Sequence, residues 1–266
     1  MGRKRRQVSP DDDGAWVFNE MASVYDARPS YPPQVVAALV ELADAVGNRV
    51  VDLGAGTGHL ALPLAERGLE VVAIEPARAM LDRLRRAAAD RRLQLETVHA
   101  AAEALPFDGP RFDLALIADA MHFLDAELVA AELRRVLVPG GALVVITCAL
   151  DRTPFMNEVR NLLEAASDRR PRDTTQAIRH LAALADVRLT RSWNVHDETA
   201  VAPTTLEGIL RSFSFVGPAM NPNRLQAFCA RLHALSSAPT WARCFTLHVG
   251  HRRRRRRAWQ PPLRSR

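Results

Sequence analysis

The first 150 residues alternate short apolar runs with longer amphipathic stretches. Runs of five to seven mostly apolar residues predict buried strands at 49–53, 70–75, 93–99, 112–117 and 142–146. Between most of these runs, apolar residues recur every three or four positions, which is the spacing of a helix with one face against a sheet. The alternation predicts an α/β fold with a mostly parallel sheet.

Local end signals place several helix boundaries. Pro33 suits the first turn of a helix because its φ is already helical and its missing N–H is not needed there, and Gly47-Asn48 ends this helix. Asp125 is predicted to cap the helix that follows the fourth strand. Pro139-Gly140-Gly141 is expected to stop that helix before the fifth strand begins.

Beyond residue 147 the alternation is interrupted. Further helices are predicted at 157–166, 174–184, 205–213 and 223–235, and further strands at 187–195 and 244–248. We expect the first two of these helices to cover the substrate end of the sheet. The two late strands bring the predicted sheet to seven strands.

Composition fits a globular protein with one large domain. The 266 residues are 48% hydrophobic, which is ample for a sizeable core. We expect this domain over 15–250, and we expect the charged segments 1–14 and 251–266 to have no fixed structure.

The sequence predicts no membrane segment and no metal site. No apolar run approaches the roughly 20 residues of a membrane span, and the charged start Met1–Gln7 has no apolar stretch of a secretory signal behind it. We therefore expect a cytoplasmic protein. Cys148, Cys229 and Cys244 are odd in number and lack metal-ligand spacing, so we expect neither a disulfide framework nor a bound metal.

The formal charge of +6 comes from the two ends of the chain. Residues 3–6 carry four basic side chains and residues 252–266 carry eight, with no acidic residue in either segment. Without these twelve, 24 basic groups face 30 acidic ones, which leaves a body of about −6. Such a body would repel a phosphate backbone, so nucleic acid is an unfavoured partner, although a basic tail could bind an anionic surface.

The most informative stretch is Val50–Leu60, a buried strand that runs into a glycine-rich turn and a helix. Gly54, Gly56 and Gly58 allow a sharp turn and a close approach to a ligand. The spacing differs from the dinucleotide fingerprint, whose third glycine comes one residue later. Asp52 would repel a phosphate at the mouth of this turn but attract a cationic group.

A second acidic residue ends the next strand. Glu75 follows the apolar run 71–74 and is placed to accept hydrogen bonds from the two hydroxyls of a ribose. A nucleoside that carries both a positive charge and a free ribose is S-adenosylmethionine. The two carboxylates together predict this molecule as the ligand.

The chain here resembles the class I S-adenosylmethionine-dependent methyltransferases, whose first motif is D/E-x-G-x-G-x-G. The segment 101–107 looks like the adenine-binding segment of that family, and 137–143 looks like its turn into the fifth strand. The resemblance covers roughly 18–147, which would be the cofactor-binding half, with the cover and last strands at about 148–250. It implies a Rossmann-like fold with seven strands and the transfer of a methyl group.

The motifs and the resemblance imply a set of cofactor-binding residues. These are Asp52, Gly54, Ala55, Gly56, Gly58, Glu75, Pro76, Met80, Ala101, Ala102 and Ala118. Ala101 stands where the family often has an aspartate that binds the adenine amino group, so only main-chain contacts are expected there. Met80 covers the adenine or belongs to the core, and the sequence leaves both options open.

Substrate and catalytic candidates lie in three other places. Tyr25, Arg28 and Tyr31 belong to a segment similar to one that folds over the cofactor in many small-molecule methyltransferases, although both tyrosines could simply pack on the first helix. His122, in the loop after the fourth strand, is the candidate general base, or else only orients the substrate or packs in the loop. Trp193 lines an apolar substrate site or is a core residue.

Three functions compete. The favoured one is a methyltransferase acting on a small molecule at oxygen, nitrogen or carbon. An RNA or DNA methyltransferase would use the arginine-rich tails, but the loop 118–123 lacks the N/D-P-P-Y/F motif of enzymes that methylate amino groups of flipped bases. A non-catalytic protein that binds S-adenosylmethionine is the third. The sequence leaves the acceptor and the oligomeric state open.

Overall fold

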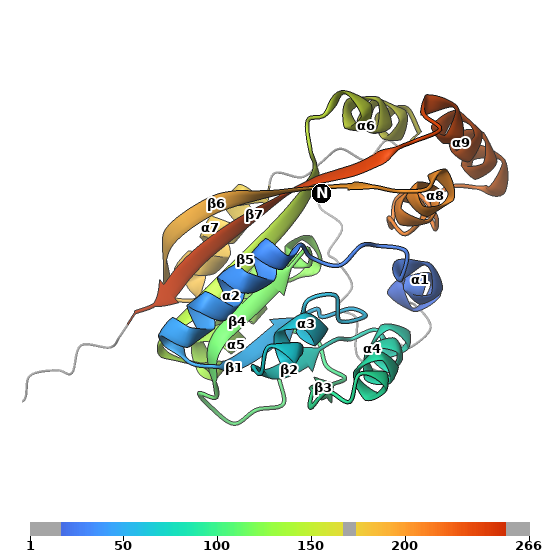
Figure 1. Cartoon of the computed structure of the whole chain (residues 1–266). Coiled ribbons are helices and arrows are strands. Elements are labelled where there is room, and N and C mark those ends of the chain that lie inside the picture. The colour runs from blue at the N-terminus through green and yellow to red at the C-terminus, as the bar shows by residue number, and fades with distance from the viewer. Residues whose placement is uncertain (1–16, 167–173, 254–266) are drawn as a thin grey trace, which may run out of the picture.

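The structure is a computed structural model that describes residues 17–166 and 174–253, so the predicted tail at 1–14 lies outside it. In chain order, the elements labelled in Figure 1 are α1 (Val17–Tyr25), α2 (Pro33–Val46), β1 (Arg49–Leu53), α3 (Ala61–Glu66), β2 (Glu70–Ile74), α4 (Arg78–Asp90), β3 (Glu96–Val98), β4 (Phe112–Ala118), the short helix η1 (Met121–Phe123), α5 (Ala126–Val136), β5 (Leu137–Leu150), α6 (Pro154–Ala166), α7 (Thr175–Leu184), β6 (Val187–Ala200), α8 (Pro203–Arg211), α9 (Pro222–Leu235) and β7 (Thr240–Arg252).

One seven-stranded sheet runs through the molecule in the order β3-β2-β1-β4-β5-β7-β6. The strands from β3 to β5 are parallel, whereas β7 is antiparallel to both β5 and β6. The predicted Rossmann-like fold with a mostly parallel sheet is confirmed. The strand order reverses between β1 and β4, and ligands bind at this position in open sheets of this kind.

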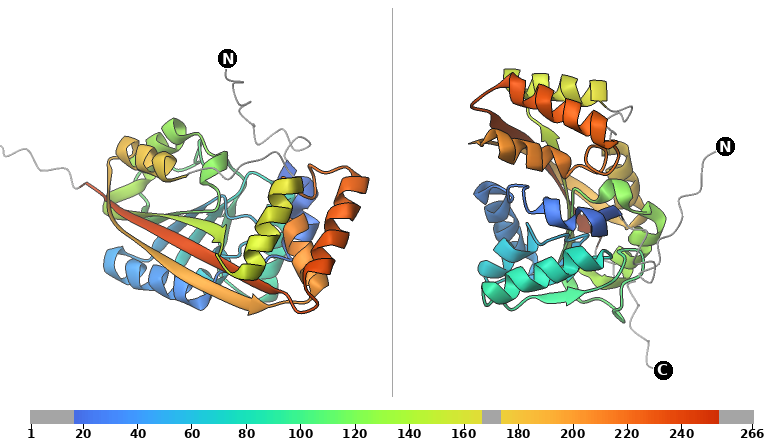
Figure 2. Two further views of the ribbon diagram at one scale, coloured as in Figure 1. Left: turned by 90° about the horizontal axis from the view of Figure 1, so that it is seen from above. Right: turned by 90° about the vertical axis from the view of Figure 1, so that its right-hand side faces the viewer.

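Helices cover both faces of the sheet, as parallel strands require. α2, α3 and α4 lie on one face and α5 and α7 on the other (Figure 2). Their buried side chains pack against the sheet in two separate clusters. Alternate residues of each strand supply the two layers. In β1, for example, Val50 belongs to the first layer and Val51 to the second.

A third layer lies over the carboxyl end of β5 and the start of β7 (Figure 1). It consists of α6, α8 and α9, whose cluster includes Met156, Ile209, Phe228 and Trp241. The sequence predicts a cover made from α6 and α7, which is wrong for α7. Ile178 of α7 is 1% exposed and packs with α5, because the sheet's second face needs this apolar helix.

The fifth strand begins earlier than predicted. α5 ends at Val136 and β5 starts at Leu137, so Pro139-Gly140-Gly141 lies inside a strand and not at a helix end. Leu137 pairs with Phe112, and the register shifts before the pairing of Leu114 with Ala142. The predicted division near residue 147 also falls inside β5, because the last strands complete the same sheet.

Strand lengths follow the partners that tertiary structure provides. β6 and β7 extend well past their predicted ends, to Ala200 and Arg252, because each is the antiparallel partner of the other. The predicted start of the tail at residue 251 is therefore wrong by two residues, and 254–266 lie outside the described residues. β3 keeps only Glu96–Val98 of the predicted 93–99.

The predicted end signals of two helices are confirmed. α2 starts at Pro33, and Gly47 follows it with a φ of 125°. The Asp125 side chain accepts from the N–H groups of Glu127 and Leu128, each at 3.1 Å.

Within the described residues, none of the helices combines the length and apolarity needed to cross a bilayer. The cytoplasmic location stays a prediction.

Gly58→Ala should destabilise the protein more than Gly68→Ala. Both glycines have a positive φ, 89° and 84°, so backbone strain of about 1–2 kcal/mol is common to the two variants. A Cβ at Gly58 would lie 2.2 Å from Cδ1 of the fully buried Leu84, whereas nothing lies within 4 Å of one at Gly68. We expect a further cost of about 1–3 kcal/mol for Gly58→Ala in urea unfolding. Equal costs would contradict the packing argument.

Candidate active site

The glycine-rich turn leaves β1 where the strand order reverses. Gly54, Gly56 and Gly58 have φ values of 78°, 59° and 89°, which glycine adopts most readily. The N–H of Gly54 donates to the carbonyl of Ile74 at 2.9 Å, which fixes the turn to the end of β2. A Cβ at Gly54 would lie 2.9 Å from Cβ of Ala120, so the turn also closely approaches the loop after β4.

Asp52 is the buried acid of this turn. It lies in β1 between Ala73 of β2 and Leu116 of β4, and it is 1% exposed. Its Oδ2 has no hydrogen-bond partner among the described residues. Burial, and then the charge of Glu75, raise the pKa of Asp52 to about 7. A cation bound beside it would stabilise the charged carboxylate, so this residue fits a positively charged ligand.

Glu75 braces the turn, a role that the sequence did not predict. Its Oε2 accepts from the N–H of Gly56 and its Oε1 from the N–H of Ala77, each at 2.8 Å. Burial raises the pKa of Glu75 to about 7, and the two hydrogen bonds oppose this rise. A carboxylate has about four acceptor positions, so two remain for the hydroxyls of a ribose.

Thr57 is a polar residue of the turn that is absent from the predicted set. It is 6% exposed, and its Oγ1 has no hydrogen-bond partner among the described residues. Buried polar atoms in proteins nearly always have partners. Two such atoms in one turn, Asp52 Oδ2 and Thr57 Oγ1, indicate a site for a polar ligand. A hydroxyl-bearing residue between the second and third glycines is the sequence feature that could have identified Thr57 as a site residue.

The predicted adenine segment follows β3, next to the end of β2. Ala101 is half-buried and Ala102 is 3% exposed. Nε2 of His99 lies 2.9 Å from the carbonyl oxygen of the half-buried Pro76, which joins the ends of the two strands. The structure therefore brings the predicted adenine segment and the predicted ribose carboxylate to one edge of the sheet.

Met80 lies in packing between two helices. It is 1% exposed and contacts a cluster with Met21, Ala22 and Ala77. This cluster joins α1 to α4, so the core role is the one that the structure supports.

The segment after α1 joins the glycine turn to the cover. The Tyr25 ring stacks on His59, with centroids 5.7 Å apart and an interplanar angle of 18°. Nη1 of Arg28 donates to the Tyr25 hydroxyl at 3.0 Å, and Nε donates to Oγ of Ser212, after α8, at 2.8 Å. Burial and the charge of Arg28 lower the pKa of His59 to about 4, so this ring is neutral.

Asp119 is the acidic residue at the end of β4 that the predicted set lacks. It directly follows the half-buried Ala118 and has a φ of 53°, a left-handed conformation that aspartate tolerates. Its Oδ1 accepts from the N–H of Cys148 at 2.7 Å, and its side chain hydrogen-bonds Tyr31. Burial raises the pKa of Asp119. An acid directly after an apolar strand, at the ligand-binding edge, was the signal that could have found it.

A buried arginine of β7 also binds the segment that follows α1. Arg243 of β7 is 7% exposed and pairs with Asp197 of β6. Its guanidinium also donates to the carbonyl oxygens of Pro29 and Ser30, each at 3.1 Å. The Tyr31 ring packs on Phe245, with centroids 5.3 Å apart. Tyr31 therefore both packs in the core and reaches Asp119.

His122 lies in η1, beneath α1. Its ring is half-buried and lies 3.9 Å from the ring of Phe123, centroid to centroid. Phe123 in turn packs edge-on against Phe18 of α1 at 4.9 Å. The three roles predicted for His122, as a general base, as an orienting residue or as a packing residue of the loop, all stay predictions.

Trp193 lies apart from the strand that carries Asp52. It is on β6, which β4, β5 and β7 separate from β1. It packs against the core on the α2 face, and the Arg191 guanidinium lies 4.3 Å from its ring centroid. The core role, left open by the sequence, is again the one that the structure supports.

Comparisons with known proteins identify the family. Residues 50–141 match the family model described as a methyltransferase domain. An uncharacterized methyltransferase of Mycobacterium tuberculosis is 34% identical over 209 residues, covering 72% of this chain and 83% of that protein. A demethylmenaquinone methyltransferase of Thermus thermophilus is 48% identical over 101 residues, 37% of this chain and 46% of that protein.

A solved structure has the same fold. The YcgJ protein of Bacillus subtilis superimposes with a TM-score of 0.56 and 17% identity, covering 83% of this chain and 98% of that one. The motif order, the sheet and the relatives define an enzyme of the methyltransferase class. The chain belongs to the class I S-adenosylmethionine-dependent methyltransferase family.

Asp52→Asn should stabilise the ligand-free protein increasingly as the pH rises. Folding raises the pKa of Asp52 to about 7, so the folded state binds this proton more tightly than the unfolded state does. The stability that the bound proton contributes is present at low pH and is lost as the pH rises through about 7. The difference in unfolding free energy, variant minus wild type, should shift by about 2 kcal/mol in favour of Asp52→Asn between about pH 5 and about pH 8. The exposed Asp90→Asn is the control, and an equal shift there would refute the prediction.

Proposed function

We propose that this chain binds S-adenosylmethionine at the glycine turn and transfers its methyl group to a small molecule, at oxygen, nitrogen or carbon. The observation that carries the proposal is the buried, unpartnered Oδ2 of Asp52 at the end of β1. An enclosed carboxylate favours a cation over a phosphate. When bound, the cofactor supplies an already activated methyl group, so the protein needs mainly to bind, orient and exclude water.

Residues of the turn and its neighbours would hold the cofactor. Asp52 faces the charged end, Glu75 accepts from the ribose, and main-chain groups of Ala101 and Ala102 bind the base. The rings of Tyr25 and His59 stack beside the turn and would limit the access of water to it. This arrangement supports one bound nucleoside that spans the carboxyl ends of β1, β2 and β3.

The acceptor would bind on the other side of the turn, near β4. Asp119 is the residue that we assign to bind the acceptor and take its proton, because its carboxylate lies at the carboxyl edge and its raised pKa suits a base. His122 is the second candidate. The Thermus thermophilus relative is named for demethylmenaquinone, which supports a small acceptor that is not a polymer.

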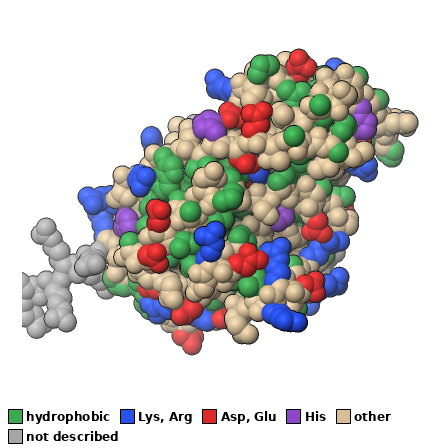
Figure 3. All heavy atoms as spheres, in the orientation of Figure 1, with side chains coloured by type: hydrophobic (Ala, Val, Ile, Leu, Met, Phe, Trp, Pro, Cys, Tyr) green, Lys and Arg blue, Asp and Glu red, His purple; other side chains and the backbone are tan. Residues whose placement is uncertain are grey.

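Nucleic acid is the less favoured acceptor. Acidic and basic side chains are interspersed over the face shown in Figure 3, whereas a nucleic-acid track needs a field of one sign. The loop 118–123 also lacks the base-gripping motif named above. A non-catalytic role has less support, because the family model and the relatives named above are methyltransferases.

Two substitutions should separate cofactor binding from methyl transfer. Asp52→Asn removes the charge that meets the sulfonium and should weaken cofactor uptake at least about tenfold in calorimetry. Asp119→Asn should bind the cofactor as wild type does, but lower kcat about a hundredfold. S-adenosylhomocysteine release would be measured against a panel of hydroquinones, phenols and amines, with His122→Gln in parallel. Uptake of NAD without uptake of S-adenosylmethionine would refute the proposal.

Removal of residues 254–266 should leave turnover intact. The cut follows Arg253, because β7 extends to Arg252 and an earlier cut would remove part of the sheet. If the acceptor is a small molecule, kcat/KM should stay within about twofold, since the deleted charges act only on a polyanion. Loss of activity, together with binding of the full chain to RNA or DNA that weakens with salt, would favour the alternative.

A further inference from the structure

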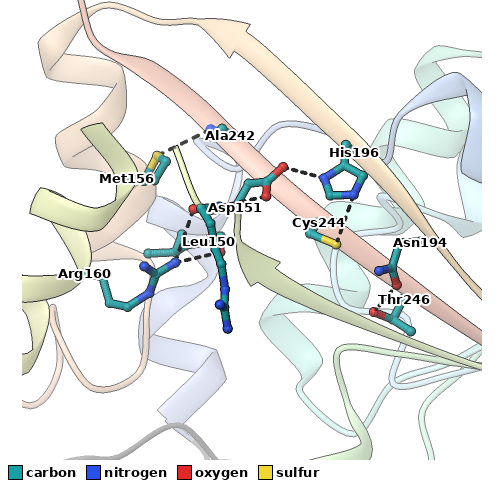
Figure 4. Close-up of polar contacts among 10 residues, drawn as sticks. Leu150, Asp151, Met156, Arg160, Asn194, His196, Ala242, Cys244 and Thr246 are labelled. Carbon is teal, nitrogen blue, oxygen red and sulfur yellow. Dashed lines mark hydrogen bonds and ion pairs between the residues drawn. The ribbon is translucent and has the colours of Figure 1, made fainter. Parts of the chain in front are cut away.

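Three titratable side chains lie together where β5, β7 and β6 run side by side (Figure 4). Asp151 follows β5, Cys244 lies on β7 and His196 lies on β6. Nδ1 of His196 is 2.6 Å from Oδ2 of Asp151, and its Nε2 is 4.0 Å from Sγ of Cys244. Within the sheet, β4 and β5 separate β7 from β1, so neither Asp52 nor Glu75 belongs to this group.

The contacts of Asp151 fix the orientation of the imidazole. Its Oδ1 accepts from the N–H of Arg152 at 2.7 Å, and its carbonyl accepts from Nη2 of Arg160 at 3.2 Å. The hydrogen bond to His196 lowers the pKa of Asp151, so the group is a carboxylate and can only accept. Nδ1 of His196 therefore carries the hydrogen, and in the neutral ring the Nε2 lone pair faces the thiol.

Cys244 has no partner cysteine on its own face of the sheet among the described residues. It pairs with Ala149, whereas Cys148 pairs with Phe245, so the two thiols point to opposite faces. Burial, and then the charge of Asp151, raise the pKa of the Cys244 thiol. The resting group is a protonated thiol, and a reaction must transfer its proton to a base. His196 is that base by position.

We propose that Cys244 is a thiol-modification site that exchanges with low-molecular-weight disulfides. The Cys244 sulfur attacks one sulfur of the disulfide R–S–S–R while Nε2 of His196 takes the thiol proton. A new S–S bond joins Cys244 to one R–S group as the old bond breaks. The departing thiolate takes the proton from His196 and leaves as R–SH. Cys244 is oxidised, one sulfur of the small disulfide is reduced, and no other reactant is required.

The surroundings favour substitution at sulfur over acyl transfer or metal binding. β7 is paired on both sides at Cys244, with Ala149 and His196, so its backbone N–H belongs to the ladder of the sheet. A tetrahedral acyl intermediate needs free donors for its oxyanion, whereas attack on a disulfide forms no such anion. The described residues contain no group of three His, Cys, Asp or Glu side chains arranged to hold a metal ion.

The exposure of His196 and Cys244 also allows a small reagent to reach the thiol. The His196 side chain is 62% exposed, and Cys244 is half-buried next to it. Cys148 is the thiol on the opposite face, where burial raises its pKa well above the usual range. Burial raises the pKa of Cys229, on α9, and the charge of Glu207 and its hydrogen bond with this thiol raise the pKa further. Among the three cysteines, Cys244 is therefore the one beside an imidazole, and the other two serve as internal comparisons.

The test uses the full chain incubated with glutathione disulfide at neutral pH, followed by peptide mass spectrometry of each cysteine. We expect Cys244 to form the mixed disulfide at least about tenfold faster than Cys229 or Cys148. His196→Ala should slow modification of Cys244 about a hundredfold, and Asp151→Asn about tenfold. His248→Ala, a histidine on the same face of β7, should leave the rate unchanged.

Two results would overturn the proposal. One is a Cys244 rate that does not change in His196→Ala while thermal unfolding shows that this variant is folded. The other is a burst of acylation at Cys244 followed by turnover of p-nitrophenyl acetate, which would assign acyl transfer instead. Because neither measurement involves S-adenosylmethionine, the outcome is independent of the proposed methyl transfer.

Discussion

The desolvation of two carboxylates constrains the active site more than any other interaction. Asp52 and Glu75 are 1% and 5% exposed, and burial raises the pKa of each to about 7. Glu75 offsets its burial by accepting from the turn, which holds the backbone in its glycine conformations. Asp52 has an oxygen with no such compensation. The folded state thus has an unfavourable desolvation free energy at Asp52, which a bound cation would reduce.

The N-terminal segment depends on that turn and on the cover together. Tyr25 stacks above the turn, Arg28 binds Ser212 of the cover, and Arg243 binds the carbonyl oxygens of Pro29 and Ser30. The contacts of Arg28 with Ser212 and of Arg243 with Pro29 and Ser30 join residues that are far apart in the sequence, so they depend on the tertiary structure. The proposed acceptor side is thus assembled from the first and last parts of the chain, which couples its geometry to the whole fold.

Local chemistry made much of the fold predictable. The apolar periods located the strands, and Pro33, Gly47 and Asp125 marked helix ends, because capping depends on neighbours in the sequence. Errors arose where a distant partner decides. β5 begins at Leu137 because β4 offers it a partner, β6 and β7 extend each other, and α7 packs with α5 because an open face of the sheet must be covered.

For the site, the sequence by itself determined the glycine turn, Asp52 and Glu75, since their types and spacing already predict a cationic nucleoside as the ligand. Only the tertiary structure showed the bracing role of Glu75, the place of Asp119 beside Cys148 and Tyr31, and the separation of Trp193 from β1. The array of Asp151, His196 and Cys244 likewise exists only in three dimensions. The physical reason is that strand order and register, which bring distant residues together, depend on the whole core and not on any local spacing.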